Sequence, residues 1–376
     1  MDVAPFELER WFDEYEHDAE IMLAESGVRS LPADRFDTDP GELGYVIPTD
    51  GDPALRERIA ERYDRSADEV VCTCGTQEAN LLTFLALLDG AAGGGNGSGG
   101  GTGAGGGDVN GSHAVVVTPT YQSLYALPEA IGEVTRVPLR EPRWTLDVDA
   151  VADAVRPETA LVVVNNPNNP TGRYHAEETI RALYDLAADA GAYLLCDEVY
   201  RQLADDPLPP VASLGPRGIS TTSLSKAYGL AGLRFGWLAA DREVADAARR
   251  WKDYTTISPP QFGQHVARQA LGRREPTILA ESRELAREHR AIVADWLDEH
   301  GLDWFEPVGV NGFVTVPDGF ADAESFCRAV VERESVVLAP GESFGYPDRF
   351  RIGFGLPTGK LRKGLERVGR VIESTG

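Results

Sequence analysis

Lysine is nearly absent from this sequence of 376 residues. Only four of its 36 basic residues are lysines, namely Lys226, Lys252, Lys360 and Lys363, and the other 32 are arginines. Arginine therefore carries nearly all of the positive charge, and Lys226 is a rare lysine in this chain.

Long apolar runs and cysteine are also scarce. No run of about 20 apolar residues occurs, so we expect no membrane-spanning helix and no membrane partner. The N-terminal segment is acidic and amphipathic, unlike a signal peptide. The four cysteines show no zinc-type spacing beyond one C-x-C pair, and no metal site is predicted. Three of them fall in apolar strand-like or helix-like contexts, which predicts reduced thiols in a cytoplasmic protein.

Positive charge is in short supply overall, with 60 acidic residues and a net charge of -24. Phosphate backbones would be repelled, which argues against a nucleic acid partner. An acidic surface could attract a basic ligand, but these charges are spread along the whole chain. Spread acidity with little lysine is typical of proteins from high-salt cytoplasms, where screening removes the self-repulsion. The composition therefore predicts a halophilic protein.

Short apolar runs of strand length alternate with helical patterns through the first two thirds of the chain. A helix rich in leucine is expected at 77–88, and another helix at 53–64. This alternation is typical of a mostly parallel sheet covered by helices on both faces, the α/β class. The expected strands are residues 70–73, 114–118, 160–165, 192–197, 219–224 and 235–240.

The two ends of the chain have a different pattern. An amphipathic helix is expected over residues 5–26, followed by an irregular arm to residue 44. After about residue 255 a long helix is expected at 258–298, then a group of short strands and a terminal helix after Pro357. We predict a large domain at 45–255 and a smaller α+β domain built from 1–44 and 256–376. The expected strands of this smaller domain are 313–316, 336–338 and 350–354.

Residues 90–112 contain 13 glycines in 23 positions. A phosphate-binding loop needs two or three glycines at fixed offsets, and this run has no such order. It is interpreted as a flexible insertion between a helix and the next strand.

Lys226 lies among small and hydroxyl-bearing residues, directly after the apolar run 219–224. A lysine at the end of a buried strand is costly unless its amine is used chemically. One use is a Schiff base with an aldehyde cofactor. Ser223 and Arg234 in the same segment are suited to hold a phosphate, the first by its hydroxyl and the second by its fork of N–H donors. Alone, this segment fits a surface lysine at a strand end equally well.

Two further segments offer contacts to a phosphorylated ring. The turn at Gly75, Thr76 and Gln77 lies between a strand and a helix, where a glycine and free helix N–H groups favour phosphate binding. Tyr121 follows a strand and offers an aromatic face for stacking. Many strand-to-helix turns look similar, so each signal is weak by itself.

Two more segments place polar groups after strands. Asn165-Asn166-Pro167-Asn168-Asn169-Pro170-Thr171-Gly172 is a rigid loop dense in side-chain amides, suited either to punctuation or to binding a ligand oxygen. Asp197 ends an apolar strand in Asp197-Glu198-Val199-Tyr200. A buried carboxylate wants a cationic partner, and no basic residue is adjacent. A protonated ring nitrogen is the candidate partner.

Together these segments resemble the fold-type-I pyridoxal-phosphate enzymes, and within them the class I and II aminotransferases. The resemblance covers about residues 45–351 in the family's order and spacing. It rests on N-P-x-N-P-T-G, on D-E-x-Y and on S-x-S-K with an arginine eight residues later. It implies a large domain with a mostly parallel seven-stranded sheet, a smaller α+β domain, and pyridoxal 5′-phosphate as the cofactor.

The resemblance also implies a role for each matching residue. Lys226 would carry the Schiff base and move the proton at the substrate Cα. Asp197 would pair with the pyridinium nitrogen, so that the ring acts as an electron sink. The remaining cofactor contacts would be Asn169 and Tyr200 to the phenolic oxygen, Tyr121 on the ring face, and Gly75, Thr76, Gln77, Ser223, Ser225 and Arg234 at the phosphate.

Substrate and partner contacts follow from the same resemblance. Arg351, in Phe350-Arg351-Ile352-Gly353-Phe354, matches the arginine that binds the substrate α-carboxylate, although its strand setting would also fit a surface charge. Gly27 and Asn169 are the other expected substrate contacts. Tyr45 falls where the family supplies a tyrosine to the neighbouring subunit's phosphate, which implies a homodimer with shared sites.

Two readings of the reaction stay open at this point. The leading one is an aminotransferase that moves an amino group between an amino acid and a 2-oxo acid. The alternative is a lyase or cyclase on the same scaffold, because the segment from Trp11 to Val28 is closer to enzymes such as capreomycidine synthase that build arginine-derived amino acids. No second arginine is evident at 255–264 for a distal carboxylate, which argues against a specialist for dicarboxylates. A binding module without catalysis is disfavoured because Lys226, Asp197 and Arg351 are all present.

Overall fold

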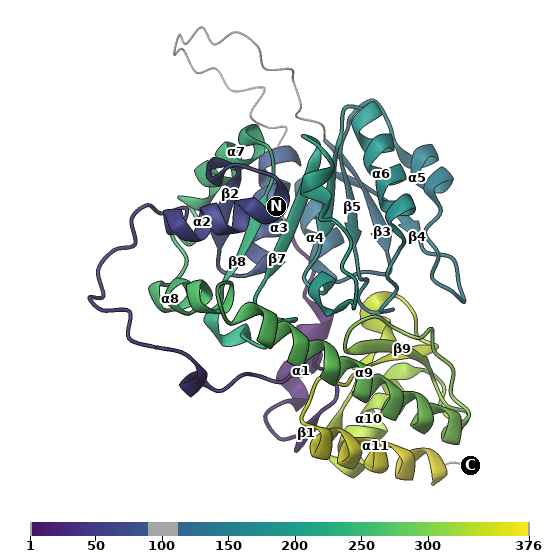
Figure 1. The fold of residues 1–376 in the computed structure, drawn as a ribbon. Helices are drawn as coiled ribbons and strands as arrows, with labels where there is room; N and C mark the ends of the chain where they lie inside the picture. Colours follow the sequence, from purple (N-terminus) through teal and green to yellow (C-terminus); the bar gives the residue numbers. More distant parts are fainter. Residues whose placement is uncertain (1, 89–111, 375–376) are drawn as a thin grey trace, which may run out of the picture.

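The structure is a computed structural model that describes residues 2–88 and 112–374 (Figure 1). The glycine-rich stretch predicted at 90–112 lies outside the described residues except for Ser112. In the described part of the chain, no helix is both long enough and apolar enough to cross a membrane.

A seven-stranded sheet forms the larger part of the molecule, as the sequence predicts. Its strand order is β2-β8-β7-β6-β5-β3-β4. Strand β8 runs antiparallel to both of its neighbours, and the other pairs are parallel. The strands are β2 (Val70–Thr73), β3 (His113–Thr118), β4 (Glu133–Pro138), β5 (Thr159–Asn165), β6 (Tyr193–Asp197), β7 (Gly218–Ser223) and β8 (Gly236–Ala239).

Successive side chains of each strand point to opposite faces of this sheet, and both faces are packed against other parts of the molecule. On one face, Val116, Val163 and Leu195 pack against the apolar side of helices α3, α4 and α7. On the other, Val117 and Val164 join the core that continues into the C-terminal part of the chain. Both faces are therefore buried, which is why the strands appear in the sequence as continuous apolar runs.

Helices cover the sheet and build the rest of the molecule. Figure 1 shows α9 and α11 beside strand β9 (Asn311–Thr315), which belongs to a smaller, three-stranded sheet. The helices are α1 (Glu7–Tyr15), α2 (Pro53–Ala60), α3 (Thr76–Leu88), α4 (Ser123–Ile131), α5 (Val148–Ala154), α6 (Glu177–Asp189), α7 (Arg242–Lys252), α8 (Gln261–Ala270), α9 (Glu275–His300), α10 (Ala323–Glu334) and α11 (Thr358–Glu373). Short 3₁₀ helices lie at Ala33–Arg35, Glu61–Tyr63, Ala67–Glu69, Arg201–Leu203, Val211–Leu214, Ala231–Leu233 and Gly341–Phe344.

Two small sheets join the ends of the chain. Strand β12 (Arg349–Gly353) pairs antiparallel with β11 (Ala339–Pro340) and with β9 (Asn311–Thr315). Strand β1 (Ile21–Met22) pairs in parallel with β10 (Val336–Val337). The N-terminal segment is thereby held against the C-terminal part of the molecule.

The helix predicted at 5–26 is wrong in its extent, because α1 ends at Tyr15. Residues 20 and 21 instead bond through their backbone N–H groups to the carbonyl of Ser335, which starts the pairing of β1 with β10. Helical periodicity in the sequence did not account for this long-range pairing.

The single helix predicted at 258–298 is also wrong, because the structure has α8 and α9 in its place. Gly272 lies in the break, where a Cβ atom would come within 2.5 Å of the Arg58 guanidinium. Pro276 occupies the first turn of α9, where its missing N–H is not needed. Strand β4 had no predicted counterpart because it is a half-exposed edge strand without an apolar run.

Candidate active site

A cavity of about 610 Å³ opens at the carboxyl ends of the parallel strands, where open α/β sheets bind ligands. Helix α1 and strand β12 complete its walls. Eleven of the predicted site residues line it: Thr76, Gln77, Tyr121, Asn169, Asp197, Tyr200, Ser223, Ser225, Lys226, Arg234 and Arg351.

The amine of Lys226 is held inside this cavity. Its Nζ atom donates to Ser26 Oγ at 3.1 Å, and the Tyr200 hydroxyl donates to the same Ser26 oxygen at 2.9 Å. Burial, together with the nearby charge of Arg351, lowers the pKa of Lys226 to about 8. A lysine with a lowered pKa supplies more neutral amine at neutral pH, which nucleophilic and acid–base chemistry both need.

Asp197 ends strand β6 and is fixed from two sides. Its Oδ2 accepts from Asn80 Nδ2 at 3.0 Å, and its Oδ1 accepts from the Val199 amide at 3.1 Å. Asn80 is oriented in turn by the Thr221 hydroxyl, which donates to Asn80 Oδ1 at 2.6 Å. Burial raises the pKa of Asp197 to about 6, because removal from water disfavours the charged carboxylate more than the bonds from Asn80 and Val199 favour it. The site thus holds a buried carboxylate that a cationic ligand group would stabilise.

Arg351 is buried rather than a surface charge, with 2% of its surface exposed. Its Nη1 donates to Asn169 Oδ1 at 2.9 Å and its Nη2 donates to the Ala24 carbonyl at 2.6 Å. Its Nε has no hydrogen-bond partner. An uncompensated guanidinium with a free donor beside a cavity is suited to a carboxylate ligand.

The Asn165 side-chain amide fixes the loop that carries Asn169. Asn165 Nδ2 donates to the Asp197 carbonyl at 2.9 Å, and Asn165 Oδ1 accepts from the Asn169 amide at 2.6 Å. Tyr121 follows the neighbouring parallel strand β3, and its hydroxyl donates to Glu9 Oε1 at 3.1 Å. Its ring contacts the Phe6 ring with a centroid distance of 5.0 Å.

The turn at residues 74–77 forms the other end of the cavity with Arg234. Gly75 has φ of +91°, and a Cβ at this position would lie 2.9 Å from Arg234 Nη2, so only glycine fits. Arg234 Nη2 donates to the Cys74 carbonyl at 3.3 Å. The Thr76 hydroxyl is shielded from solvent and has no hydrogen-bond partner. These unfilled donors at a helix N-terminus fit an anion such as a phosphate.

Gly27 and Tyr45 do not line the cavity. Gly27 lies behind it, where a Cβ would touch the Ser225 carbonyl at 3.4 Å and Lys226 Cδ at 3.5 Å. A larger residue there would therefore press on the lysine. Tyr45 lies on an extended arm and is 93% exposed.

Glu9, Glu25, Ser26 and Asn80 are polar residues of this site that sequence reasoning missed. Glu9, Glu25 and Ser26 line the cavity directly. Asn80 contacts Asp197 from within the buried face of α3. A signal for Asn80 existed, because an asparagine inside a leucine-rich helix needs a partner.

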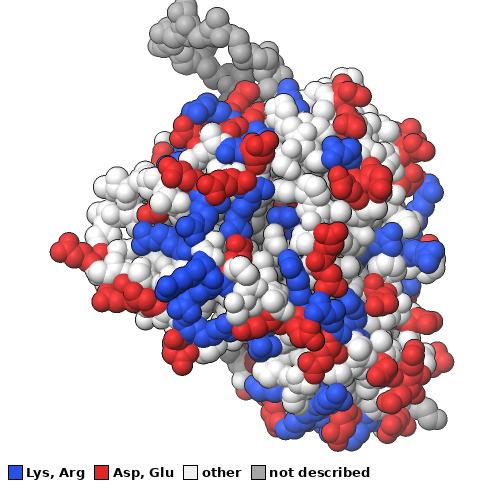
Figure 2. Space-filling view, viewed as in Figure 1, with Lys and Arg blue, Asp and Glu red and all other residues white. Residues whose placement is uncertain are grey.

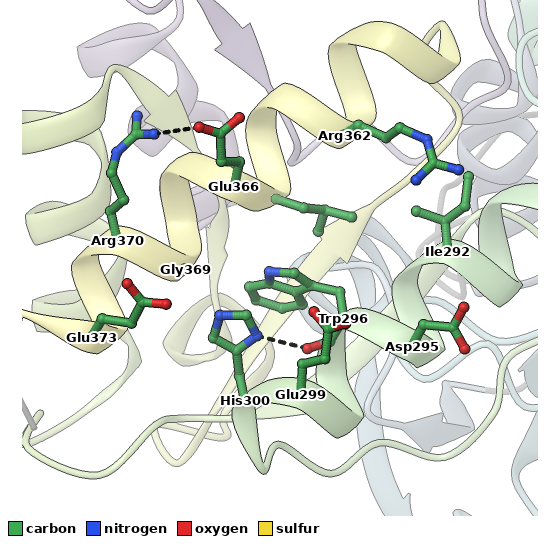
Figure 3. Close-up of a pocket in the computed structure, with 11 residues that line it drawn as sticks. Ile292, Asp295, Trp296, Glu299, His300, Arg362, Glu366, Gly369, Arg370 and Glu373 are labelled. Atoms are coloured by element: carbon green, nitrogen blue, oxygen red, sulfur yellow. Dashed lines mark hydrogen bonds and ion pairs between the residues drawn. The ribbon is translucent and has the colours of Figure 1, made fainter.

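A second hollow, of about 480 Å³, lies between α9 and α11 (Figure 3). Asp295, Glu299, Glu366 and Glu373 contribute carboxylates to its walls, and none of the predicted site residues lies there. Among the residues that the structure describes, no group of three or more His, Cys, Asp or Glu side chains is arranged to hold a metal ion. The predicted site residues that share a cavity therefore share the first one.

Comparison with known proteins identifies similar chains. Residues 14–368 match the family model described as aminotransferase class I and II. The chain is 32% identical to capreomycidine synthase of Streptomyces vinaceus, over 96% of this chain and 92% of that protein. It is 28% identical to a probable aspartate/prephenate aminotransferase of Thermus aquaticus, over 96% of this chain and 89% of that protein.

Solved structures give the same picture. A PLP-dependent aminotransferase from Streptococcus suis 89-1591 superimposes with a TM-score of 0.89 at 29% identity, covering 100% of this chain and 99% of that one. The PLP-dependent cyclase OrfR superimposes with a TM-score of 0.83 at 29% identity, with the same coverage of 100% and 99%. The predicted fold is confirmed.

Proposed function

Because this chain belongs to the aminotransferase class I and II family, we propose that it is an aminotransferase acting on an amino acid and a 2-oxo acid. Its cofactor is pyridoxal 5′-phosphate. The observation that carries the proposal is that one cavity contains Lys226, Asp197 and Arg351. A nucleophilic amine, a buried carboxylate and a guanidinium able to bind a carboxylate are the three groups that such a reaction needs.

The residues present fit this cofactor. Thr76 Oγ1 lacks a partner and Arg234 lies beside the Gly75 cradle, so the turn and Arg234 would hold the phosphate. Asp197, which lacks an ion-pair partner, would pair with the ring nitrogen, and Tyr121 would cover the ring face. When bound, the cofactor supplies an electron sink for the bonds at the substrate Cα.

The protein side chains would bind the substrate and move its proton. Arg351 would bind the substrate α-carboxylate in a bidentate manner and fix the Cα near Lys226. The Lys226 amine would then remove or return the Cα proton. Ser26 would orient this amine through the hydrogen bond from Lys226 Nζ.

The charges of the cavity disfavour a dicarboxylate substrate. Its cationic residues are Lys226, Arg234 and Arg351, and each of them has a proposed role. No fourth cationic residue lines the cavity in the part of the chain that the structure describes. Glu9, Glu16 and Glu25 line it instead. A neutral or cationic substrate side chain is therefore favoured over aspartate or glutamate.

A second candidate is a lyase or cyclase acting on an amino acid. It is supported by the similarity to capreomycidine synthase and to the cyclase OrfR. The carboxylates at the cavity wall support it also, since they suit a basic side chain. Lys226, Asp197 and Arg351 would keep the same roles in either reaction.

Absorbance of the bound cofactor separates the two reactions. An aminotransferase mixed with its amino acid alone should convert the cofactor stoichiometrically to the pyridoxamine form, and a 2-oxo acid should reverse the change. A lyase or cyclase should turn over repeatedly without that conversion. We expect conversion, with arginine or ornithine reacting faster than aspartate or glutamate. Agmatine, which is arginine without its carboxylate, is the matched control and should be inert because Arg351 has nothing to bind. If aspartate were the best amino donor, the proposal that the substrate has a neutral or cationic side chain would be wrong.

The arm around Tyr45 supports a homodimer as the working assembly. Leu43, Tyr45 and Ile47 are 70%, 93% and 83% exposed, and Figure 1 shows this arm extended away from the body. Gln261 anchors its base by donating to the Glu42 carbonyl at 2.8 Å. Large apolar side chains exposed on an anchored arm fit burial against a second copy of this chain.

The excess of 60 acidic over 36 basic residues supports adaptation to high salt. On the face shown in Figure 2 acidic side chains are interspersed with basic ones. All four cysteines are free thiols, which supports a reducing cytoplasm. With a net charge of -24, we expect a dimer in roughly molar salt that dissociates and loses activity on dilution. Sedimentation velocity at both salt concentrations measures this. A protein that is dimeric and fully active in dilute buffer would remove the halophilic assignment, and a monomer in molar salt would remove the dimer.

A further inference from the structure

Lys252 and Glu78 form a buried ion pair that the proposed chemistry does not use. Lys252 is 1% exposed and Glu78 is 8% exposed, and the Lys252 Nζ lies 3.4 Å from both carboxylate oxygens. The lysine ends α7 and the glutamate lies in the first turn of α3. Burying two opposite charges is costly and is not needed to join these helices, which already pack through apolar side chains.

Two threonines complete the pair. The hydroxyls of Thr255 and Thr256 donate to Glu78 Oε1 at 2.8 and 2.5 Å, and Lys252 Nζ donates to Thr256 Oγ1 at 2.6 Å. Both threonines lie in the connection between α7 and α8. The carboxylate is therefore held by groups from outside its own helix.

The same carboxylate reaches the turn at residues 74–77. Glu78 Oε2 accepts from the Cys74 amide at 2.6 Å, and the Cys74 carbonyl accepts from Arg234 Nη2 at 3.3 Å. Gly75 follows directly and lies against the Arg234 guanidinium. Glu78 thus fixes the backbone N–H of Cys74, and Arg234 contacts the backbone carbonyl of the same residue.

Charge makes the lysine necessary at this place. Burial opposes ionisation of Glu78, but the bonds from the Cys74 amide and Thr256 and the charge of Lys252 outweigh it and hold its pKa below the ordinary value. An ionised carboxylate two residues from Thr76 would weaken binding of a phosphate there unless a cation neutralised it. Lys252 is that cation.

We propose that Lys252 and Glu78 act as a positioning pair for phosphate binding, with Glu78 fixing the turn and Lys252 cancelling the charge of Glu78. The proposal rests on the assignment of the 75–77 turn and Arg234 to the cofactor phosphate. It predicts that phosphate affinity depends on the pair even when no reaction takes place.

The test is binding to the cofactor-free protein, measured by equilibrium titration with pyridoxal phosphate and, separately, with inorganic phosphate. Lys252→Met leaves a buried, uncompensated carboxylate and should weaken both affinities at least tenfold. The double variant Lys252→Met/Glu78→Gln should return to within about threefold of wild type, since a glutamine oxygen still accepts from the Cys74 amide. Thr256→Val buries no new charge and should weaken both affinities by a smaller factor. It replaces Lys252→Met as the test variant if Lys252→Met does not fold.

Two controls separate this pair from general stability and from the site itself. Glu69 lies at the other end of β2 and likewise accepts from a backbone amide, that of Ser66, and from a cation, Arg65. Glu69→Gln should lower the melting temperature without changing either affinity. Arg234→Ala should weaken phosphate binding, and if it does not, the phosphate site itself is misplaced. If Arg234→Ala weakens binding but Lys252→Met stays within twofold of wild type, or the double variant binds as weakly as Lys252→Met, only the positioning role is overturned.

Discussion

Replacing Lys226 with alanine should lower kcat by at least about 10⁴-fold while leaving the protein folded. A positioned acid–base group alone contributes up to about 10⁴-fold, and this variant also loses the covalent attachment of the cofactor. Within the described residues the Lys226 amine donates a hydrogen bond to Ser26, and the loss of this bond should change stability little. Borohydride reduction followed by peptide mapping measures the attachment, and steady-state kinetics measures the rate.

The control for this experiment is Lys360→Ala, because Lys360 is exposed on α11 and does not line the cavity. It should keep the wild-type rate and the fixed cofactor. In wild type, the label should be found on the peptide that contains Lys226. A label on a peptide containing Lys252, Lys360 or Lys363 would remove Lys226 from its proposed role.

The sequence predicted the sheet well because most of its strands are buried on both faces. Such strands appear as apolar runs, as at β5 and β6, where every residue is buried. The edge strand β4 has a single buried residue, the others being exposed or half-exposed, and gave no such run. The end of α1 was not predictable from periodicity, because it depends on pairing with residues more than 300 positions away.

The same distinction holds in the candidate active site. Lys226, Asp197 and Arg351 could be predicted because each lies in a compact motif with fixed spacing. Ser26 and Asn80 belong to no such motif, and their contacts to Tyr200 and Asp197 span 174 and 117 positions. Residues that orient a catalytic group through tertiary contacts leave only the weak local signal of a polar residue in an apolar setting.

Asp197→Asn should retain the fold and lower kcat by about 10²–10³-fold, which corresponds to about 2.7–4 kcal/mol of electrostatic stabilisation. The substituted amide keeps the shape of the side chain and its reach to Asn80, but it lacks the negative charge that would pair with the ring nitrogen. The matched control is Asp241→Asn. Asp241 accepts from Tyr193 on the same strand as Asp197, β6, and from the Val244 amide, and it does not line the cavity. That variant should lose stability and keep its rate.

The pH dependence of the cofactor-free protein tests the same assignment without catalysis. Burial raises the pKa of Asp197 from 3.8 to about 6, so the folded state holds this proton more tightly than the unfolded state. The contribution of Asp197 to stability should therefore be lost as the pH rises from about 4 to 6, so the free energy of unfolding of wild type minus that of Asp197→Asn should decrease across this range. Affinity for pyridoxal phosphate should change in the opposite sense, rising with pH through about 6 as the carboxylate forms and becomes able to pair with the ring. Urea unfolding and cofactor titration across this range measure both trends.

A group that pairs with the ring must act through its charge. If the affinity of wild type for pyridoxal phosphate is flat across this range, and the rate of Asp197→Asn is within about threefold of wild type, Asp197 is a structural residue.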